Sequence, residues 1–299
     1  MRWKNWSKAI RGSYTNMQEL IQKATEIVAM SRSITVLTGA GISAESGIAT
    51  YRDADGLWNN FRAEDFSSVE SFKKDPKMVW DWYKERRRLM AAAEPNAGHK
   101  ALAEMERRNM QFMLLTQNID GLHQRAGTDN IVELHGSVWR LRCTMCLDEW
   151  EYRGEMDSGM PFCGSCHGLA RPAVVWFSEP LNESQWQRAV RAAYCDTMIV
   201  VGTSALVNPV ASLPDLALKN GARVIEVNLE KTPITEIATV SIQGKAGEIL
   251  PELVKETDVS VAGTHELDLG KAMQRGLEKF YAKYPQLRPF VEGSGGKVE

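Results

Sequence analysis

Short apolar runs, many of them β-branched, recur along the chain and alternate with stretches in which apolar residues return every three or four positions. The runs that predict β-strands are SITVLT (33–38), QFMLLT (111–116), IVEL (131–134), AVVWF (173–177), TMIVVG (197–202) and ARVIEV (222–227). The stretches that predict helices are 16–31, 97–108, 183–194 and 209–219. Strands that alternate with helices in this way predict an α/β protein whose parallel sheet is covered by helices on both faces.

The segments that follow these strands are rich in Gly, Ser, Thr, Asn, Asp and Gln. In chain order they begin GAGISAESGIATYRD, QNIDG, HGS, SEP, TSALVNP and NLEKTP. Because ligands of parallel sheets bind beyond the carboxyl ends of the strands, we expect these segments to converge on one crevice that binds a polar, phosphate-bearing ligand. Residues 39–41 would let backbone amides approach a pyrophosphate at a helix N-terminus, and 202–204 offer a second set of donors. The GAG turn taken alone is equally typical of a plain tight turn.

Four of the five cysteines form two CxxC pairs, Cys143 with Cys146 and Cys163 with Cys166, and sixteen residues separate the pairs. This spacing is typical of a structural zinc site, in which each CxxC turn presents two thiolates to one tetrahedral ion. Redox-active or disulfide-forming dithiols are the alternative interpretation. Cys195 remains, and we expect it to be a buried core residue.

Two parts of the chain interrupt the alternation of strands and helices. The cysteine motif lies between residues 137 and 172, and a helical excursion spans about 55–94. A segment that cannot build its own core can fold around a metal ion instead. We therefore expect the two insertions to pack together as a smaller zinc-containing domain, with a cleft between it and the large sheet.

The second insertion contains a helix with an unusual apolar face. In VWDWYKERRRLM (79–90) that face is predicted to consist of Val79, Trp82, Tyr83, Leu89 and Met90. Arg86 falls near its centre, one turn after Tyr83, whereas Arg87 and Arg88 are expected to point away from it. A half-buried guanidinium needs a partner, because an unpaired charge away from water is costly.

Composition and charge narrow the possible functions. With 299 residues, 43% of them apolar and 25% charged, the chain is long enough for one large domain with a smaller insert. The formal charge of −2 gives no reason to expect nucleic-acid binding, and no run of eighteen apolar residues predicts a membrane span. The N-terminus MRWKNWSKAIRGSYTNM lacks the apolar core of a secretory signal, and we interpret it as a basic lead-in to the first helix rather than a mitochondrial presequence. We expect a cytoplasmic monomer that binds neither nucleic acid nor a membrane.

Several motifs together resemble the sirtuins, a family of NAD-dependent protein-lysine deacylases. These motifs are GAGISAESGIATYRD, TQNIDGLHQRAG, ELHGS, the paired CxxC motifs, GTSALVNPVASLP, VNLE and GKAGEILP. The resemblance implies a catalytic domain over residues 14–255, with a Rossmann-like, doubly wound large domain at about 14–54, 95–136 and 172–255. The smaller domain would comprise about 55–94 and a zinc module at 137–171. Residues 256–299 would form a C-terminal extension without an assigned function, including a helix near 266–283.

Carried over position by position, the resemblance implies that NAD binds in the cleft between the two domains. The residues that would bind it are Gly39, Ala40, Gly41, Ser43, Glu45, Tyr51, Arg52, Trp58, Gln117, Asn118, Ile119, Asp120, Gly202, Thr203, Ser204, Asn228, Leu229, Glu230 and Ala246. The implied catalytic residues are His135, Asn118 and Asp120, and the implied contacts to an acyl-lysine of another protein are Tyr83, Arg86, Ala54, Val175 and Phe177. One structural Zn²⁺ would be held by Cys143, Cys146, Cys163 and Cys166.

The implied reaction transfers the acyl group from lysine to the ribose of NAD. The acyl oxygen would attack the ribose carbon that carries nicotinamide, and His135 would then take a proton from a ribose hydroxyl. The products would be free lysine, nicotinamide and O-acyl-ADP-ribose. Histidine suits this role because its ordinary pKa lies near neutrality. The residues alone favour His135 over His123 without deciding between them, whereas the family motif selects His135; His99, His167 and His265, which show no convergent partner, are expected to be structural or exposed.

The spacing of Tyr83 and Arg86 resembles the pair that reads the acyl carboxylate in sirtuins that prefer acidic acyl groups. Ala54 resembles the small residue that leaves room for such groups. The resemblance therefore implies removal of succinyl or malonyl groups, with some deacetylation. In the alternative, Arg86 pairs with a structural carboxylate. Other functions that remain open are an NAD glycohydrolase or ADP-ribosyltransferase of the same fold, and a catalytically silent binding module.

The chain also departs from the family pattern at four positions. They are Ala49 in place of Pro, Tyr51 in place of Phe, Ser178 in place of Gly, and Asn208 in place of an aromatic residue. We expect the ring at position 51 still to cover the ribose, so catalysis should survive. The changes at 178 and 208 lie where the substrate backbone would add as a strand, which leaves the peptide preference open.

Overall fold

A six-stranded parallel sheet forms the centre of the computed structural model, which describes residues 3–50, 57–58, 61–62, 66–109, 111–154, 159–177 and 179–255. Of residues 3–15, 57–58 and 61–62 only the backbone is described. The strand order is β11-β10-β9-β1-β4-β5. The bounds are β1 (Ser33–Thr38), β4 (Gln111–Thr116), β5 (Ile131–Glu133), β9 (Thr197–Val201), β10 (Arg223–Asn228) and β11 (Val240–Gln243). The predicted α/β fold with a doubly wound parallel sheet is confirmed.

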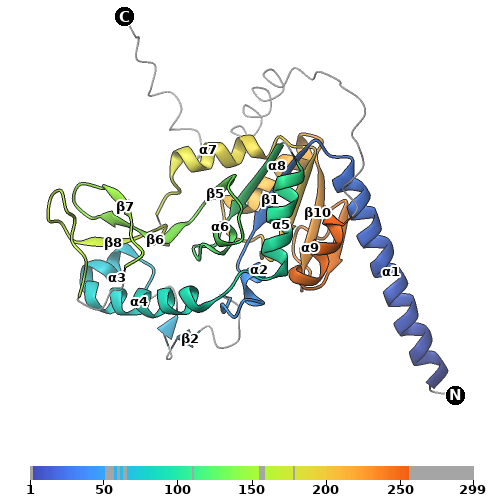
Figure 1. The fold of residues 1–299 in the computed structure, drawn as a ribbon, viewed down its shortest axis with the longest axis horizontal. Helices are drawn as coiled ribbons and strands as arrows, with labels where there is room; N and C mark the ends of the chain where they lie inside the picture. Colours follow the sequence, from blue (N-terminus) through green and yellow to red (C-terminus); the bar gives the residue numbers. More distant parts are fainter. Residues whose placement is uncertain are drawn as a thin grey trace, which may run out of the picture.

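Helices cover both faces of this sheet (Figure 1). One face packs against α1 (Trp3–Ala29), α5 (Ala97–Arg108) and α9 (Ala246–Val254), and the other against α7 (Glu183–Ala192) and α8 (Leu213–Lys219), which a 3₁₀ turn (Val210–Ser212) precedes. Neighbouring strand residues face opposite layers, as Val36 and Leu37 do, so each central strand must be apolar on both sides. Among the described residues, no helix is both long and apolar enough to cross a membrane.

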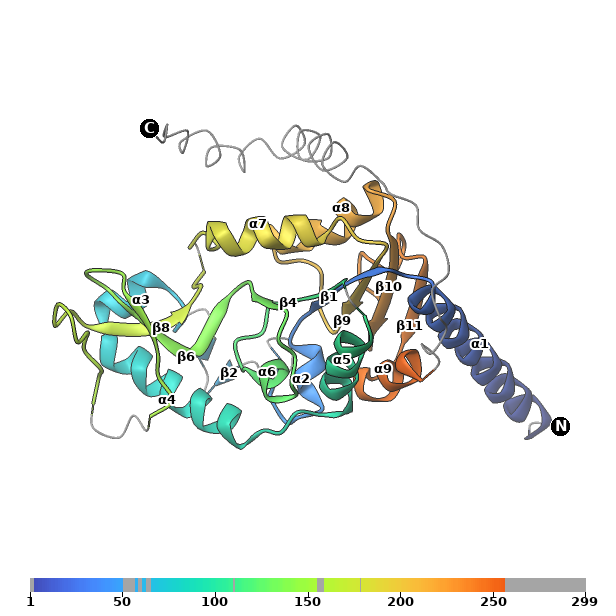
Figure 2. The ribbon, with the colours of Figure 1, turned by 45° about the horizontal axis from the view of Figure 1, so that its top comes forward.

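A second, smaller body lies beside the sheet and has its own core (Figure 2). It contains α3 (Val69–Lys74), α4 (Pro76–Ala92) and an antiparallel sheet of order β7-β6-β8, with β6 (Gly136–Cys143), β7 (Glu149–Glu151) and β8 (Ala170–Val174). We call it the small domain and the six-stranded sheet with its helices the large domain. The short strands β2 (Leu57–Trp58) and β3 (Phe61–Arg62) pair with each other. The smaller domain is thus built from two insertions, as predicted.

Most predicted elements match the observed ones, and the differences have simple causes. The run AVVWF (173–177) was expected to join the parallel sheet, but its first residues belong to β8, which pairs antiparallel with β6. All residues of β8 are buried, which gave the run the appearance of a central parallel strand. The structure adds β11, a strand too short to stand out in the sequence, and extends the first helix back to Trp3. The helix predicted near 266–283 lies outside the described residues.

The prediction that Arg87 points away from the apolar face of α4 is wrong. This side chain is only 5% exposed and donates to the main-chain oxygens of Val138 and Tyr152. Leu89, expected on the apolar face, is 42% exposed. Trp80 is buried and precedes Arg87 by two helical turns, so the two residues lie on the same face of α4. The buried face of the helix is therefore centred closer to Arg87 than the sequence predicts.

Candidate active site

The carboxyl ends of β1 and β9 pack directly against each other through glycines. Gly39 and Gly41 donate their amides to the carbonyl oxygens of Val201 and Gly202, at 3.0 and 2.8 Å. A Cβ on Gly39 would lie 2.8 Å from Gly202 O, and one on Gly41 would lie 2.7 Å from Gly202 Cα. The two glycines therefore serve the close packing of two turns, and their amides are already engaged within the protein. This use differs from the predicted one, in which these amides approach a pyrophosphate.

A buried polar network fills the space under these turns. Asn118 donates its side-chain amide to Gly39 O at 3.0 Å and to Ser43 Oγ at 3.1 Å. Ser43 in turn donates its hydroxyl proton to Asp120 Oδ2 at 2.8 Å. Asn118 and Asp120 lie after β4, whereas Ser43 lies on the short helix α2 (Gly41–Ala44) after β1. The structure thus brings together three predicted site residues from neighbouring strand ends.

Asp120 is held from several directions. Its Oδ1 accepts the amide of Leu122, the first residue of α6 (Leu122–Arg125), at 2.9 Å, and its carbonyl oxygen accepts Trp139 Nε1 at 2.6 Å. Burial raises the pKa of the Asp120 carboxyl, while these donors and the charges of Arg86 and Arg125 act in the opposite direction. The Asp120 carboxyl therefore has a fixed position, and its pKa is sensitive to the charge of any group that binds beside it.

His135 stands where β5 of the large domain passes into β6 of the small domain. Its Nδ1 lies 3.1 Å from the carbonyl oxygen of Gln117. A carbonyl can only accept, so Nδ1 carries the proton, and the neutral ring keeps its lone pair on Nε2. Burial lowers the pKa of His135, although the bond to Gln117 opposes this. The net lowering of the pKa favours a neutral imidazole, and the bond to Gln117 O fixes its tautomer, so Nε2 is available as a base at neutral pH.

The residue after His135 explains how the ring is fixed in place. Gly136 has a φ of +76°, and a Cβ there would lie 2.0 Å from Ala173 O. Only glycine fits this close crossing of β6 and β8. Gln117, whose carbonyl oxygen bonds to the ring, donates its side-chain amide to Thr203 Oγ1 at 2.9 Å. His135 therefore sits on a short, constrained step between the two domains.

Two further histidines lie behind the polar network. His99 Nε2 is 3.4 Å from Ser43 Oγ, and His123 Nε2 is 3.0 Å from Thr38 Oγ1. The ring centroids of His99 and His123 are 4.8 Å apart. Burial lowers the pKa of His99 to about 4 and also lowers that of His123, which keeps both rings neutral. The expectation that His99 lacks a convergent partner is wrong, because Asn96, the N-cap of α5, brings it beside Ser43.

The remaining predicted cofactor residues follow several strands of the large domain. Asn228 donates its side-chain amide to Thr203 O at 2.8 Å, which ties these two strand ends together. Glu45 accepts the amide of Gly247 at 2.8 Å and so binds the first turn of α9. The other described members of the set are Ala40, Ile119, Ser204 and Ala246, with Leu229 and Glu230 exposed. Tyr51, Arg52, Ala54, Ser178 and the side chain of Trp58 lie outside the described residues.

A three-residue segment after β8 connects His135 to the small-domain helix α4. Val175 donates its amide to His135 O at 2.9 Å, and Phe177 donates its amide to Ser67 O at 2.9 Å. Between them, Trp176 donates its indole N–H to Tyr83 Oη at 2.8 Å. The sequence reading named Val175 and Phe177 but missed Trp176, whose 1% exposure shows that it points into the small-domain core.

Arg86 lies at the edge of that core. Its guanidinium carbon is 4.9 Å from the centroid of the Trp82 ring, one turn earlier on α4. The side chain is half-buried, as expected, and its charge acts on the Asp120 carboxyl. The predicted acyl-reading residue is therefore close enough to the polar network to share its electrostatic field.

The four paired cysteines form a compact cluster at the edge of the small domain. Their Sγ atoms lie within 4.8 Å of one another, with contacts of 3.4 Å for Cys143–Cys166 and 3.7 Å for Cys146–Cys163. A tetrahedral ion with four Zn–S bonds of about 2.3 Å places sulfurs about 3.8 Å apart. The cluster fits a structural Zn²⁺ ion, and this cofactor prediction is confirmed.

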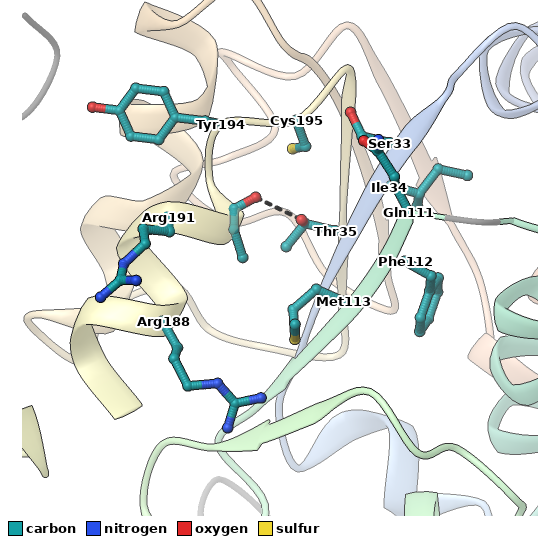
Figure 3. Close-up of a pocket in the computed structure, with 11 residues that line it drawn as sticks. Ser33, Ile34, Thr35, Gln111, Phe112, Met113, Arg188, Arg191, Tyr194 and Cys195 are labelled. Carbon is teal, nitrogen blue, oxygen red and sulfur yellow. Dashed lines mark hydrogen bonds between the residues drawn. The ribbon is translucent and has the colours of Figure 1, made fainter. Parts of the chain in front are cut away.

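A hollow of about 340 Å³ lies at the opposite end of the sheet (Figure 3). The first residues of β1 and β4 line it together with Arg188, Arg191 and Cys195. Burial raises the pKa of the Cys195 thiol to about 11, which keeps it protonated and unreactive. Because ligands of parallel sheets bind at the carboxyl ends of the strands, this hollow is not the candidate site.

Comparisons with known proteins agree with this geometry. The sequence pattern described as the Sir2 family matches residues 39–209, which is more than half of the chain. NAD-dependent protein deacylase 2 of Pyrobaculum aerophilum is 48% identical over 232 residues, covering 77% of this chain and 93% of that protein. The NAD-dependent protein deacylase of Aquifex aeolicus is 51% identical over 216 residues, covering 72% of this chain and 90% of that protein.

Solved structures show the same similarity. The crystal structure of a Sir2 homologue in complex with NAD has a TM-score of 0.76 and 45% sequence identity, and the match covers 79% of this chain and 93% of that chain. The structure of a Sir2 protein bound to a myristoylated histone peptide has a TM-score of 0.65 and 39% identity, with coverage of 81% and 97%. Both matches include the large and the small domain.

Proposed function

The chain belongs to the Sir2 family and is an NAD-dependent protein deacylase, as its motifs predict, and from this premise we propose that it prefers acyl groups with a distal carboxylate. Succinyl-, malonyl- and glutaryl-lysine on other proteins are the substrates of this class, and acetyl-lysine is a poorer one. The observation that carries the proposal is the segment 175–177, which is bonded at one end to His135 and at Trp176 to Tyr83.

His135 acts as the general base in this proposal. Its Nδ1 is held by Gln117 O, so Nε2 is the atom that accepts a proton from a ribose hydroxyl. The lowered pKa keeps this atom unprotonated at neutral pH. The constrained turn at Gly136 holds the ring in one orientation, so little reorganisation is needed when the proton moves.

Asn118, Ser43 and Asp120 act as a rigid polar wall beside the base. NAD, when bound, supplies the ribose carbon that receives the acyl oxygen and the nicotinamide that leaves. The fit of this group is supported by the buried network itself, because amide, hydroxyl and carboxyl groups meet at the strand ends within hydrogen-bond distance of one another. The resemblance to the family implies that Asn118 and Asp120 bind the nicotinamide end, and both closely follow Gln117, whose carbonyl oxygen bonds to His135.

Tyr83 and Arg86 supply the acyl preference. An arginine binds a carboxylate through two parallel hydrogen bonds, and a phenol adds a third donor. Val175 bonds to His135, and the next residue, Trp176, bonds to Tyr83. Because the Cα atoms of consecutive residues are only about 3.8 Å apart, this segment links His135 and Tyr83 over a short length of chain. An acetyl group brings no negative charge to this pair and gains nothing from it.

The test compares removal of succinyl and acetyl groups from one peptide by the wild-type enzyme, Arg86→Met and Arg88→Met. Arg88 is the matched control, because it lies on the same helix, is exposed and pairs with Glu85 at 2.5 Å. We expect Arg86→Met to lower the ratio of kcat/KM for succinyl over acetyl about a hundredfold, since it removes charge-assisted hydrogen bonds. Arg88→Met should leave this ratio unchanged. A wild-type preference for acetyl, with the ratio unaffected by Arg86→Met, would contradict the proposal.

An NAD glycohydrolase or ADP-ribosyltransferase activity was the alternative from sequence, and the comparisons do not favour it. Both relatives named above are protein deacylases. Release of nicotinamide at the full rate without any acyl peptide is the result that would revive the alternative. The monomeric state and the cytoplasmic location stay predictions.

A further inference from the structure

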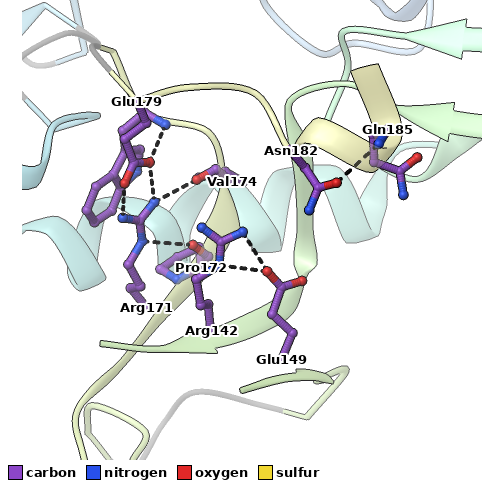
Figure 4. A network of polar contacts seen from close by, with 9 residues as sticks. Arg142, Glu149, Arg171, Pro172, Val174, Glu179, Asn182 and Gln185 are labelled. Atoms are coloured by element: carbon purple, nitrogen blue, oxygen red, sulfur yellow. Dashed lines mark hydrogen bonds and ion pairs between the residues drawn. The ribbon is translucent and has the colours of Figure 1, made fainter. Parts of the chain in front are cut away.

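A largely buried ion pair lies beside the segment 175–177, which connects His135 to α4. Arg171, on β8, donates two parallel hydrogen bonds of 2.6 and 2.7 Å to the Glu179 carboxylate (Figure 4). The two side chains are only 8% and 19% exposed. Charge-assisted bonds in this paired geometry are strong and directional, so they can hold a neighbouring segment in a defined position.

The pair contacts both the main chain and the ring of Trp176. Glu179 Oε2 accepts the Trp176 amide at 2.9 Å, and the Glu179 amide donates to Trp176 O at 3.0 Å. The Arg171 guanidinium carbon lies 3.4 Å from the centroid of the Trp176 ring, and Arg171 Nη2 donates to Val174 O at 2.7 Å. The ring also packs against Phe72, at a centroid distance of 5.3 Å. Loss of the Glu179 carboxylate would therefore release the main chain at position 176 while the ring keeps contacts of its own.

The residues on either side of Trp176 are those expected to contact the substrate. Their amides, those of Val175 and Phe177, each donate to a main-chain oxygen at 2.9 Å. Phe177 is 48% exposed although Trp176 is buried, so the segment presents a large apolar ring from a main chain that is bonded at each of its three residues. The resemblance to the family implies that Val175 and Phe177 contact the acyl-lysine. The substrate would thus meet a main chain that is already ordered.

We propose that Arg171 and Glu179 are positioning residues for substrate binding, whose ion pair holds the main chain of residues 175–177 in the conformation that receives the acyl-lysine peptide. A segment that is ordered beforehand does not lose its conformational freedom when the peptide binds, so the pair strengthens binding. This inference rests on the deacylase activity and not on the proposed acyl preference. Because the pair acts through the main chain, it should favour acetyl and succinyl peptides equally.

The experiment measures the Kd of one lysine peptide in its acetyl and succinyl forms by calorimetry, with the wild-type protein, Glu179→Ala and Glu179→Gln. We expect Glu179→Ala to raise the Kd of both forms about tenfold, which corresponds to about 1.4 kcal/mol. Glu179→Gln keeps one acceptor oxygen and should recover part of the affinity. The KM for NAD should stay unchanged, because the residues that the pair bonds, at positions 172, 174 and 176, are not among those predicted to bind the cofactor.

Two other variants of the small domain serve as matched controls. Arg87→Met removes a guanidinium of nearly the same burial, 5% exposed against 6% for Arg171, whose bonds go to other parts of the domain. Glu149→Ala breaks the neighbouring Arg142–Glu149 pair of 2.6 Å, which joins β6 to β7 (Figure 4). Both should leave the Kd of the peptides unchanged, and thermal unfolding of all variants measures their structural cost.

An unchanged peptide Kd in Glu179→Ala, or an equal rise in Arg87→Met, would overturn the inference and leave the pair as a stabilising contact alone. A rise confined to the succinyl form would also overturn it, because the effect would then pass through the bond from Trp176 to Tyr83. The Arg86→Met experiment is separate. If Arg86→Met does not change the succinyl-to-acetyl ratio while Glu179→Ala weakens both peptides, only the proposed acyl preference fails.

Discussion

The carboxyl end of the large sheet and the aromatic core of the small domain border the same site but hold their residues in different ways. At the sheet end, short polar side chains bond to one another and to strand-end carbonyls, as Asn118, Ser43 and Asp120 do. In the small domain, Trp82, Tyr83 and Trp176 pack as rings and make few polar bonds. The first arrangement is set by strand register, and the second by side-chain packing around a metal-bound module.

This difference separates chemistry from specificity. The polar wall and His135 lie on elements whose positions follow from the parallel sheet, so the reacting groups are placed by the fold itself. The proposed acyl-reading residues, Tyr83 and Arg86, lie on α4, which packs in the small-domain core. On the proposed roles, substitutions on α4 should alter specificity while the bond from His135 Nδ1 to Gln117 O is kept.

Loss of the zinc ion tests whether the small domain depends on its metal. Cys146→Ser removes one ligand at an exposed position and creates no core cavity. We expect zinc content to fall from one per chain to near zero, and both acyl activities to be lost as α4 loses its support. Metal analysis and kinetics on the purified protein provide the measurement. Retention of full activity without zinc would mean that the aromatic core is sufficient by itself.

Replacement of the base should act on the chemistry alone. We expect His135→Ala to lower kcat for succinyl and acetyl substrates alike, by about 10²- to 10⁴-fold, because it removes general-base catalysis. The melting temperature should change little, since the ring is bonded to Gln117 only through one carbonyl. A lower kcat for only one of the two acyl substrates would show that catalysis and acyl specificity cannot be assigned to separate regions of the molecule.

The arginine series of α4 should separate stability from specificity within one turn of helix. Arg87→Met leaves the oxygens of Val138 and Tyr152 without their buried donor, so we expect the free energy of unfolding to fall by about 3 kcal/mol. Arg88→Met should change it by less than about 0.5 kcal/mol, as is usual for exposed ion pairs. Denaturant unfolding gives both values. A larger loss for Arg88→Met than for Arg87→Met would refute the burial argument.

The two buried histidines predict a smaller, pH-dependent effect in the large domain. The pKa of His99 is about 4 in the folded protein and near 6.5 when unfolded, so the unfolded chain binds more protons between these values. Its contribution to stability is complete above pH 6.5 and is lost as the pH falls towards 4. We expect His99→Gln to remove about 2 kcal/mol of the decrease in unfolding free energy between pH 7.5 and 5. An unchanged slope would show that His99 can be protonated in place.

The sequence was informative where one physical rule determines the structure. Strands buried on both faces stand out as apolar runs, paired CxxC turns predict a metal site, and polar residues after strands predict a crevice. The position of Arg87 was missed because the helical face was drawn without Trp80, which would have shifted its centre. Trp176 was missed because nothing in a linear pattern shows which ring of the small-domain core meets Tyr83.

Arg87 donates hydrogen bonds to the main-chain oxygens of Val138, Tyr152 and Gly154, and its guanidinium also lies over the rings of Trp139 and Tyr152. Every amino acid, proline included, supplies the same carbonyl group. The hydrogen bonds of this tie between α4 and the strands of the zinc module therefore depend on the backbone and not on which side chains the three acceptor residues carry. The arginine itself has no such freedom, because no other side chain offers five donors in one plane. Among related chains, we expect the arginine at this position to be invariant.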